Sequence, residues 1–452
     1  MKSVPSRHIH VAGVAGVGMS ALAQVLTWTT ARVTGSDRYF DRGEDLPVFK
    51  SLEASGIELV RQDGRVVSSE TDAVVYSTAI EAENPDLAAA SRLGVPLRHR
   101  AAMLAELARD HVVLAIAGTA GKTTTTAMIG WVLEQAGMDP TVVNGGSLVD
   151  WADASHVGNV RRGGRDAPWV VEVDESDRSL LHFFPQWSVL TNISQDHFPL
   201  EDVQALFREY ALQVKRGIIC SAGVSSVLGT PSADLVELDA VPLRGRDGYD
   251  LPWRNDILRV PQPGRHNAFN ALMAAELCFR LDVEPAVVRE ALARFGGVQR
   301  RLERVDSGGP VQVVDDYAHN PAKIAAAWEA VAFPENRVLG IWRPHGYAPL
   351  RSMMEGLTDA FASVCRPQDH LWILPVYDAG GTACRSIQSD ELVARLRQRG
   401  VKAEWVRDYA AAGDAVAREM KKVDRVLVMG ARDPRLPVFA RELASAASAV
   451  RN

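Results

Sequence analysis

Residues 114–126 have the sequence LAIAGTAGKTTTT, in which an apolar strand pattern meets a helix pattern across a short turn with two glycines. Glycines let backbone N–H groups turn inward around phosphate oxygens, and the N-terminus of the following helix directs positive charge at the anion. A lysine at this point reaches the outer phosphates, and a hydroxyl directly after it suits Mg²⁺. The segment predicts a loop that binds the phosphates of ATP, with these contributing residues: Gly118, Thr119, Gly121, Lys122, Thr123 and Thr124.

The loop is a shortened form of the pattern G-x-x-x-x-G-K-[ST], because Ile116 occupies the position of the first glycine. The alternative is an ordinary strand-to-helix turn that happens to carry glycines and a lysine. The strand, loop, lysine, hydroxyl and helix all occur in the expected order, which favours phosphate binding.

Short apolar runs alternate with longer amphipathic stretches along the chain, which is typical of α/β layers built on parallel sheets. The pattern begins three times, at His8, at His111 and near Arg300. We therefore expect three α/β domains, over residues 1–108, 109–298 and 299–452, with the phosphate loop in the second. Ligands of open α/β sheets collect at the carboxyl ends of the strands, so polar residues at those ends are candidates for chemistry.

Composition excludes several classes of function. The 452 residues carry a formal net charge of -6, and a mildly acidic chain is a poor general binder of nucleic acid. The four cysteines form no C-x-x-C pair, so we expect neither a zinc site nor a disulfide framework. No apolar run approaches the ~20 residues of a membrane span, and the N-terminus lacks a signal-peptide pattern. We expect a cytoplasmic monomer or homodimer that acts on small molecules, without nucleic acid or a membrane.

Carboxylates follow the strand pattern WVVEVDESD at residues 169–177. Glu172 lies inside this strand, where a charge is costly unless it meets a cation or a partner. His197 ends the next strand pattern, TNISQDH. Because Mg²⁺ takes one or two carboxylates together with phosphate oxygens, we expect Thr123, Glu172 and His197 to serve the metal. The alternatives are a carboxylate on an edge strand and a hydrogen-bonded loop histidine.

A second glycine turn lies near the N-terminus, where GVAGVGMS at residues 13–20 separates a strand from a helix. The spacing is G-x-x-G-x-G rather than the G-x-G-x-x-G of dinucleotide sites, and Asp37 ends the next strand. A diphosphate at the helix N-terminus, with Asp37 on a ribose hydroxyl, fits this pattern. A nicotinamide cofactor and a nucleotide-sugar fit it equally well, and a tight turn without a ligand is the alternative.

Ten segments taken together resemble the Mur ligases of peptidoglycan synthesis, in the order of that family. They are HIHVAGVAGVGMSALA, STAI, AGTAGKTTTTAM, VNGG, VEVDESD, TNISQDH, PGRHNAFNA, RRLE, DDYAHNP and RPHG. The resemblance implies a Rossmann-like N-terminal domain for a UDP-sugar, a central P-loop ATPase domain and a Rossmann-like C-terminal domain that brings the amino acid. It also implies ATP and Mg²⁺, with a substrate carboxylate converted to an acyl phosphate that an amine then attacks.

The implied substrates are UDP-N-acetylmuramate and a small amino acid, L-alanine. Another amino acid, a peptide or a different carboxylate acceptor stays open. The resemblance implies catalytic roles for Lys122, Glu172, His197 and Arg301. It implies further nucleotide contacts from His266, Asn267, Arg301 and Asp316. It implies substrate contacts from Gly16, Gly18, Met19, Ser20, Asp37, Ser77, Thr78, Ala79, His319 and His345.

Three residues depart from the pattern of the family. Ala120 stands where the family usually carries a histidine in the loop, Asn320 replaces the second histidine of D-Y-x-H-H-P, and Gly346 replaces an arginine after Pro-His. Arg343 and Arg351 are the candidates to compensate for the missing arginine. ATP use does not depend on these positions, but the identity of the incoming amine does.

Two hypotheses from other classes compete with a ligase. A nucleotide-binding regulator that lost catalysis would be expected to lack Lys122, Glu172 or His197, and all three are present. A nicotinamide-dependent oxidoreductase would use the N-terminal turn, but its glycine spacing is wrong and the phosphate loop would have no role.

Overall fold

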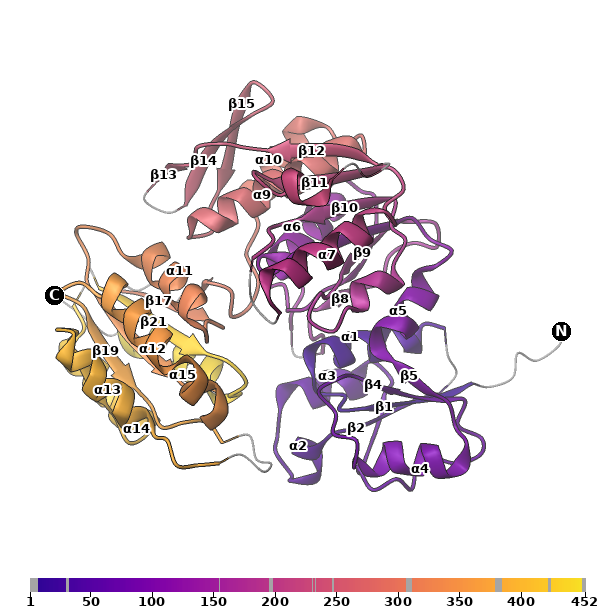
Figure 1. The fold of residues 1–452 in the computed structure, drawn as a ribbon, viewed down its shortest axis with the longest axis horizontal. Helices are drawn as coiled ribbons and strands as arrows, with labels where there is room; N and C mark the ends of the chain where they lie inside the picture. The colour runs from indigo at the N-terminus through magenta and orange to yellow at the C-terminus, as the bar shows by residue number, and fades with distance from the viewer. Residues whose placement is uncertain are drawn as a thin grey trace. The chain divides into compact units, whose positions relative to one another are not determined.

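The computed structural model describes residues 7–29, 32–153, 155–194, 198–229, 231, 233–245, 248–305, 311–378, 384–421 and 424–448. The chain divides into two compact units. The first comprises Met1–Pro261 and His266–Val298, and the second comprises Gln262–Arg265 and Gln299–Asn452 (Figure 1).

The first sheet of the first unit is parallel throughout, in the order β3-β2-β1-β4-β5. Its strands are β1 (His8–Ala12), β2 (Arg32–Ser36), β3 (Glu58–Val60), β4 (Ala73–Tyr76) and β5 (Leu97–His99). Its helices are α1 (Val17–Thr27), α2 (Arg38–Asp41), α3 (Pro47–Ala54), α4 (Pro85–Leu93) and α5 (Arg100–Ala108). The strand order reverses between β1 and β4, so the loops after these two strands open at the edge where such sheets bind ligands.

The second sheet has the order β12-β11-β10-β6-β9-β7-β8, and only β8 is antiparallel to its neighbour. Its strands are β6 (Val113–Ala117), β7 (Thr141–Val143), β8 (Val160–Arg161), β9 (Trp169–Glu172), β10 (Trp187–Leu190), β11 (Gly217–Ser221) and β12 (Asp234–Leu238). Its helices include α6 (Lys122–Gln135), the 3₁₀ helix η1 (Ser179–His182), α7 (Leu200–Ala211) and α8 (Ser225–Leu228). Because β6 lies between β9 and β10, the loops that follow these three strands are neighbours.

The stretch from about residue 223 to residue 259 has weak periodicity in sequence, and the structure accounts for it. After β12 the chain forms a small antiparallel sheet of β13 (Leu243–Arg244), β14 (Tyr249–Trp253) and β15 (Asp256–Val260). Two helices follow, α9 (Arg265–Arg280) and α10 (Pro285–Ala293). Leu251 and Leu258 of the small sheet pack in the same core as Met128 of α6 and Leu272 of α9.

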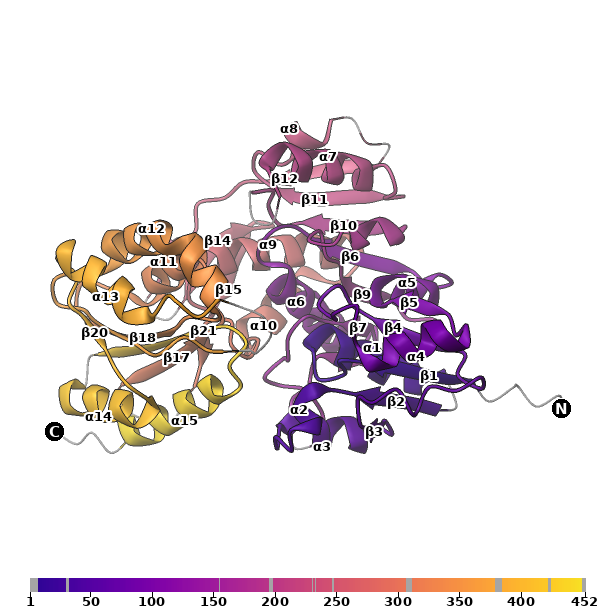
Figure 2. The ribbon, with the colours of Figure 1, turned by 60° about the horizontal axis from the view of Figure 1, so that its bottom comes forward.

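The second unit contains one six-stranded sheet in the order β16-β17-β21-β18-β19-β20. Its strands are β16 (Glu303–Arg304), β17 (Gln312–Asp316), β18 (Val338–Arg343), β19 (His370–Ile373), β20 (Ala403–Trp405) and β21 (Arg425–Gly430). Its helices are α11 (Pro321–Val331), α12 (Tyr347–Val364), α13 (Ser389–Gln398), α14 (Tyr409–Glu419) and α15 (Arg435–Ser448). Figure 2 shows α11, α12 and α13 on one face of this sheet and α14 and α15 on the other, which gives it two apolar cores.

One apolar core runs from the first sheet into the second and joins the two halves of the first unit. It contains Leu22 of α1, Leu104 of α5, Leu180 of η1 and Phe207 of α7, all fully or nearly fully buried. The predicted α/β class with parallel sheets is confirmed. In the described part of the chain, no helix has the length and apolar content needed to span a bilayer.

Candidate functional site

The glycine turn between β6 and α6 has a backbone that only glycine fits. Gly118 has a φ of +128° and Gly121 a φ of +87°, in the region that L side chains rarely adopt. A Cβ atom would lie 2.1 Å from Thr191 Oγ1 at Gly118, and 2.6 Å from Asn270 Oδ1 at Gly121. The helix begins at Lys122, so its positive end faces the turn. The turn therefore has the backbone of an anion-binding loop.

Lys122 lies with its ammonium group beneath this loop. Its Nζ donates to Gly118 O at 2.7 Å and forms an ion pair with Glu175 Oε2 at 2.5 Å. Burial disfavours the charge, but the carboxylates of Glu175, Asp174 and Glu172 outweigh it and hold the pKa of the lysine above its usual value. Burial and the nearby Asp174 raise the pKa of Glu175, in spite of the ammonium beside it. The loop thus keeps one fixed positive charge next to its backbone N–H groups.

Glu172 ends β9 and meets the first turn of α6. Its Oε1 accepts from Thr123 Oγ1 at 3.1 Å, and its Oε2 accepts from Gly145 N at 2.7 Å. Gly145 allows this approach, since a Cβ there would lie 2.4 Å from Glu172 Oε2. A hydroxyl and a carboxylate side by side at a phosphate loop are oxygen donors of the kind that Mg²⁺ takes together with phosphate oxygens.

His197, the third predicted metal ligand, lies outside the described residues. Within the described ranges, no cluster of three or more His, Cys, Asp or Glu side chains is arranged to hold a metal ion by itself. Thr123 and Glu172 are the described oxygen donors of the predicted magnesium site, which phosphate oxygens and water would complete. Both side chains offer oxygen atoms, which are the ligands that Mg²⁺ prefers, so the prediction of magnesium stays.

Asn192 and Ser194 support the loop, and the sequence analysis missed both. Asn192 Oδ1 accepts from Thr119 Oγ1 at 2.5 Å and from Ala120 N at 3.0 Å, while its Nδ2 donates to Ala120 O at 2.9 Å. Ser194 Oγ lies 2.7 Å from Thr119 Oγ1. The hydroxyl of Thr119 is therefore bonded to other protein side chains. The predicted contact of Thr119 with phosphate would then come from its backbone N–H, and it stays a prediction. The sequence signal for both was the polar character of the segment after β10, which is the strand beside β6.

The N-terminal glycine turn lies at the switch point of the first sheet. Gly16 is the N-cap of α1, and its N–H donates to Gly13 O at 3.1 Å. Residues 77–79, predicted to bind the sugar nucleotide, follow β4, the strand beside β1. The two loops touch, because a Cβ at Gly13 would lie 2.5 Å from Ile80 Cδ1. The structure thus brings Gly16 and Ser77, Thr78 and Ala79 to one edge of one sheet.

Three other residues predicted to bind the sugar nucleotide are buried or bonded to protein groups. Asp37 accepts from Ala15 N at 3.1 Å and from Tyr39 N at 3.0 Å, and burial raises its pKa. Ser20 and Met19 are buried in α1, where Ser20 Oγ donates to Val17 O at 2.9 Å. Asp37 thus shapes the turn, and contacts of all three with a sugar nucleotide stay predictions.

Arg100 is a further cation at this edge that the sequence analysis missed. Its Nη1 is the nearest atom to a Cβ built on Gly18, at 3.1 Å. The guanidinium also forms ion pairs with Asp174 at 3.3 Å and Asp177 at 3.7 Å, both from the loop after β9. The N-terminal glycine turn is therefore linked through Arg100 to the acidic segment beside the phosphate loop.

The start of α9 lies against the phosphate loop. Asn270 approaches Gly121 closely, and its Nδ2 donates to Asn267 Oδ1 at 3.2 Å. His266 is one residue before Asn267, in the first turn of α9. The predicted nucleotide contacts His266 and Asn267 are thus brought beside the loop within the first unit.

The second unit gathers its predicted site residues around Tyr317, at the carboxyl ends of β17 and β18. The Arg301 guanidinium lies 5.4 Å from the Tyr317 ring centroid. Rings stack edge to face from Tyr317 to His319 at 5.6 Å, and from His319 to His345 at 4.8 Å. Asp316 accepts from two backbone N–H groups, those of Leu302 at 2.7 Å and Ala318 at 2.8 Å.

The departures from the family pattern have local structural partners. Asn320 is the N-cap of α11, and its Oδ1 accepts from Lys323 N at 2.9 Å. Arg343 forms an ion pair with Asp433 and donates to Tyr409 Oη at 3.2 Å. Arg351 donates to Ser386 Oγ at 2.9 Å. The suggestion that Arg343 or Arg351 takes the place of an arginine at Gly346 therefore stays open, since both already bond to protein groups.

His345 predicts a pH dependence of stability. Burial, together with the nearby groups His319, Arg432 and Lys323, lowers the pKa of His345 to about 4. The unfolded chain takes up this proton near pH 6.5, so the stability that His345 contributes is complete above that pH and is lost as the pH falls toward 4. We expect the free energy of unfolding to fall by about 1–3 kcal/mol more in the wild type than in His345→Gln between neutral pH and about pH 4.5. Urea unfolding of both proteins at the two pH values measures this, and equal losses would contradict the assignment.

A phosphate loop, a paired hydroxyl and carboxylate beside it and a second glycine turn on a linked sheet are the features of a protein that binds nucleotide phosphates. Three family models match the chain: the Mur ligase family catalytic domain over residues 8–112, the Mur ligase middle domain over residues 116–204, and the Mur ligase glutamate ligase domain over residues 300–432. The chain belongs to the Mur ligase family, whose members are ATP-dependent ligases that join an acid to an amino acid. The predicted family, three-domain fold and class of enzyme are confirmed.

The named relatives match over almost their whole length. The chain is 34% identical to the UDP-N-acetylmuramate–L-alanine ligase of Desulfosudis oleivorans, covering 94% of this chain and 96% of that protein. It is also 34% identical to the ligase of the same name from Sorangium cellulosum, with 94% of each chain covered. The structure matches the UDP-N-acetylmuramate-alanine ligase of Thermotoga maritima with a TM-score of 0.79, 25% identity and coverage of 97% of this chain and 98% of the other. A murein peptide ligase of Psychrobacter arcticus shares the fold, with a TM-score of 0.66, 20% identity and coverage of 99% and 100%.

Proposed function

We propose that this chain joins L-alanine to UDP-N-acetylmuramate at the expense of ATP, in the synthesis of peptidoglycan precursors. The similarity to ligases of that name, which extends over 94% of the chain, carries the proposal. We further propose that residues 1–108 bind the UDP-sugar, residues 109–298 bind ATP and residues 299–452 present the amino acid. We propose that the enzyme acts in the cytoplasm, where ATP and a nucleotide-sugar would be available, and that it is a monomer or a homodimer.

The residues of the loop suggest how the chain performs the first step. A carboxylate is a poor electrophile, and transfer of the γ-phosphoryl group makes one of its oxygens a leaving group. The loop N–H groups and Lys122 stabilise the charge of the transferred group, and a fixed ammonium does so without reorganisation. Thr123 and Glu172 would hold Mg²⁺, which neutralises phosphate charge when bound. The amine then attacks the acyl phosphate, and phosphate leaves from the tetrahedral intermediate.

Phosphate release tests the proposal. We expect purified protein with ATP, Mg²⁺ and UDP-N-acetylmuramate to release phosphate when L-alanine is added, and not with other amino acids or short peptides. Removal of the metal with EDTA should abolish the release of phosphate. The oxygen lone pairs of Thr123 and Glu172 cannot bind the phosphate oxygens directly, and Mg²⁺ would connect the two sets of ligands. Restoration by added Mg²⁺ is the control. Equal release in the presence of EDTA would contradict the role of magnesium.

A second candidate keeps the reaction and changes the amine. Gly346 stands where the family pattern has an arginine, and a Cβ there would lie 3.4 Å from Pro349 Cδ. Arg343, three residues earlier in the chain, bonds to Asp433 and Tyr409. Release of phosphate only with a different amino acid or with a peptide would favour this candidate. If no amino acid or peptide causes phosphate release, in a protein that still binds UDP-N-acetylmuramate, the carboxylate acceptor would be a different compound.

A further inference from the structure

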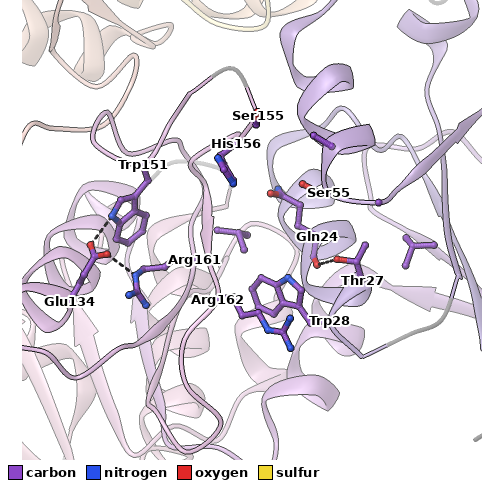
Figure 3. Close-up of a pocket in the computed structure, with 14 residues that line it drawn as sticks. Gln24, Thr27, Trp28, Ser55, Glu134, Trp151, Ser155, His156, Arg161 and Arg162 are labelled. Carbon is purple, nitrogen blue, oxygen red and sulfur yellow. Dashed lines mark hydrogen bonds and ion pairs between the residues drawn. The ribbon is translucent and has the colours of Figure 1, made fainter.

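A cavity of about 760 Å³ lies within the first unit, and Figure 3 shows residues that line it. Its wall includes Gln24 and Trp28 near the end of α1, Glu134 near the end of α6, and Trp151, Arg161 and Arg162 from the segment before β9. This volume falls within the range of small-molecule pockets. The N-terminal sheet and the central sheet both contribute to it, and none of the predicted substrate or nucleotide residues lines it.

Helix geometry separates the cavity from the predicted substrate sites. The glycine turns stand at the N-termini of α1 and α6, whereas the cavity lies at their C-terminal ends. The two helices have 11 and 14 residues, which at about 1.5 Å per residue span about 16 and 21 Å. The cavity is therefore a separate site.

One wall of the cavity is fixed by hydrogen bonds. Glu134 accepts from Trp151 Nε1 at 2.8 Å and from Arg161 Nε at 2.9 Å. Arg161 also donates to Pro140 O at 2.8 Å. The guanidinium of Arg161 also pairs with Asp139 Oδ1 at 2.8 Å, so two carboxylates offset its charge, and the indole of Trp151 is held in one orientation. This wall offers a rigid aromatic ring, and its arginine is already paired.

The opposite wall has a cation in excess. The Arg162 guanidinium carbon lies 5.6 Å from the ring centroid of Trp28, and no hydrogen bond or ion pair of Arg162 is found among the described residues. His156 also lines the cavity, but it pairs with Asp153 at 2.9 Å. Arg162 is thus left as an exposed donor beside an aromatic face. Arginine at such a position stacks on planar groups and binds phosphate or carboxylate through its fork of N–H donors.

We propose that this cavity binds a planar heterocycle that carries an anionic group, a ligand of the nucleoside monophosphate class. The ring stacks against Trp28, with Trp151 forming the fixed wall, and Arg162 binds the anion. The carbonyl oxygen of Gln24 is an additional acceptor for the ring, since the amide nitrogen of this side chain already donates to Ser20 O and Asn159 Oδ1.

The test is a binding titration of the full chain with uridine 5′-monophosphate and adenosine 5′-monophosphate, followed by tryptophan fluorescence. ADP with Mg²⁺ and UDP-N-acetylmuramate are kept at saturating levels, so that both glycine turns are filled. Uridine, which lacks the anionic group, and inorganic phosphate, which lacks the ring, are the two controls. We expect one nucleotide to bind with a Kd of about 1 mM or lower, and both controls to bind at least about 10-fold more weakly.

Three variants connect the binding to the cavity. Arg162→Ala and Trp28→Ala should each weaken nucleotide binding by about 10-fold or more, while Arg165→Ala, an exposed arginine outside the cavity wall, should not change it. Arg162→Glu reverses the charge without a change in the core, and serves if Trp28→Ala does not fold. The proposal is overturned if neither nucleotide binds at roughly millimolar concentration, if uridine binds as tightly as its monophosphate, or if the Arg162 variants bind like the wild type.

Discussion

Replacement of Lys122 by alanine is expected to lower kcat for phosphate release by about 10³-fold or more, while the affinity for UDP-N-acetylmuramate remains within a few-fold of the wild type. The ammonium of Lys122 is the fixed positive charge of the loop, bonded to Gly118 O at 2.7 Å. Its removal takes away a charge that acts on the phosphoryl group in the transition state. The predicted sugar site lies at the switch point of the other sheet and does not contain Lys122. Steady-state kinetics and calorimetric titration of the sugar nucleotide measure the two effects.

The design has to separate loss of chemistry from loss of fold. Lys122→Ala leaves the buried Glu175 carboxylate without its partner, which costs about 3 kcal/mol in comparable buried pairs. The double variant Lys122→Ala/Glu175→Gln removes the unpaired charge, and should recover stability but not turnover. Lys215→Ala, an exposed lysine after α7, is the matched control. Loss of sugar binding together with turnover, in a folded protein, would contradict the assignment of the two sites to separate domains.

Local patterns were sufficient to predict the parts of the site that depend on neighbours in sequence. The strand, the glycines and Lys122 follow each other within a few residues, and the alternation of apolar runs predicts the sheets. The position of Glu172 beside Thr123 was also predictable, because Glu172 ends β9 and Thr123 follows the neighbouring parallel strand β6 at the same edge of the sheet. In each case the geometry of an α/β unit brings residues at the carboxyl ends of neighbouring strands close together in space.

Contacts between segments far apart in sequence were not predictable in this way. Asn192 binds the backbone of Ala120 across 72 residues, and Arg100 meets Asp174 across 74. The first contact depends on which strand lies beside β6, and the second depends on how the two sheets pack. The local sequence pattern contains neither kind of information. Packing between the two sheets also buries Met19 and Ser20, and Asn159 donates to Ser20 Oγ at 3.0 Å, which the motif alone did not predict. Their predicted contacts with the sugar nucleotide stay predictions.

The inactive-regulator hypothesis and the ligase differ most at Glu172. Its carboxylate bonds Thr123 Oγ1 and Gly145 N, and a carboxamide of the same shape keeps an acceptor for one of these donors. Glu172→Gln should therefore fold normally. The lost negative charge weakens the hold on Mg²⁺, so we expect kcat at a fixed metal concentration to fall by about 10²- to 10³-fold and the half-saturating Mg²⁺ concentration to rise by about 10-fold or more.

Metal titration distinguishes this effect from a general loss of activity. If Glu172 holds Mg²⁺ together with Thr123 and the phosphates, a higher metal concentration restores part of the lost rate of Glu172→Gln, because the ion still has the hydroxyl and the phosphate oxygens as ligands. Glu209→Gln, an exposed carboxylate on α7, should match the wild type at every metal concentration. A rate that falls equally at all metal concentrations would mean that Glu172 only positions Gly145 and the loop. Unchanged kinetics would remove this carboxylate from the site.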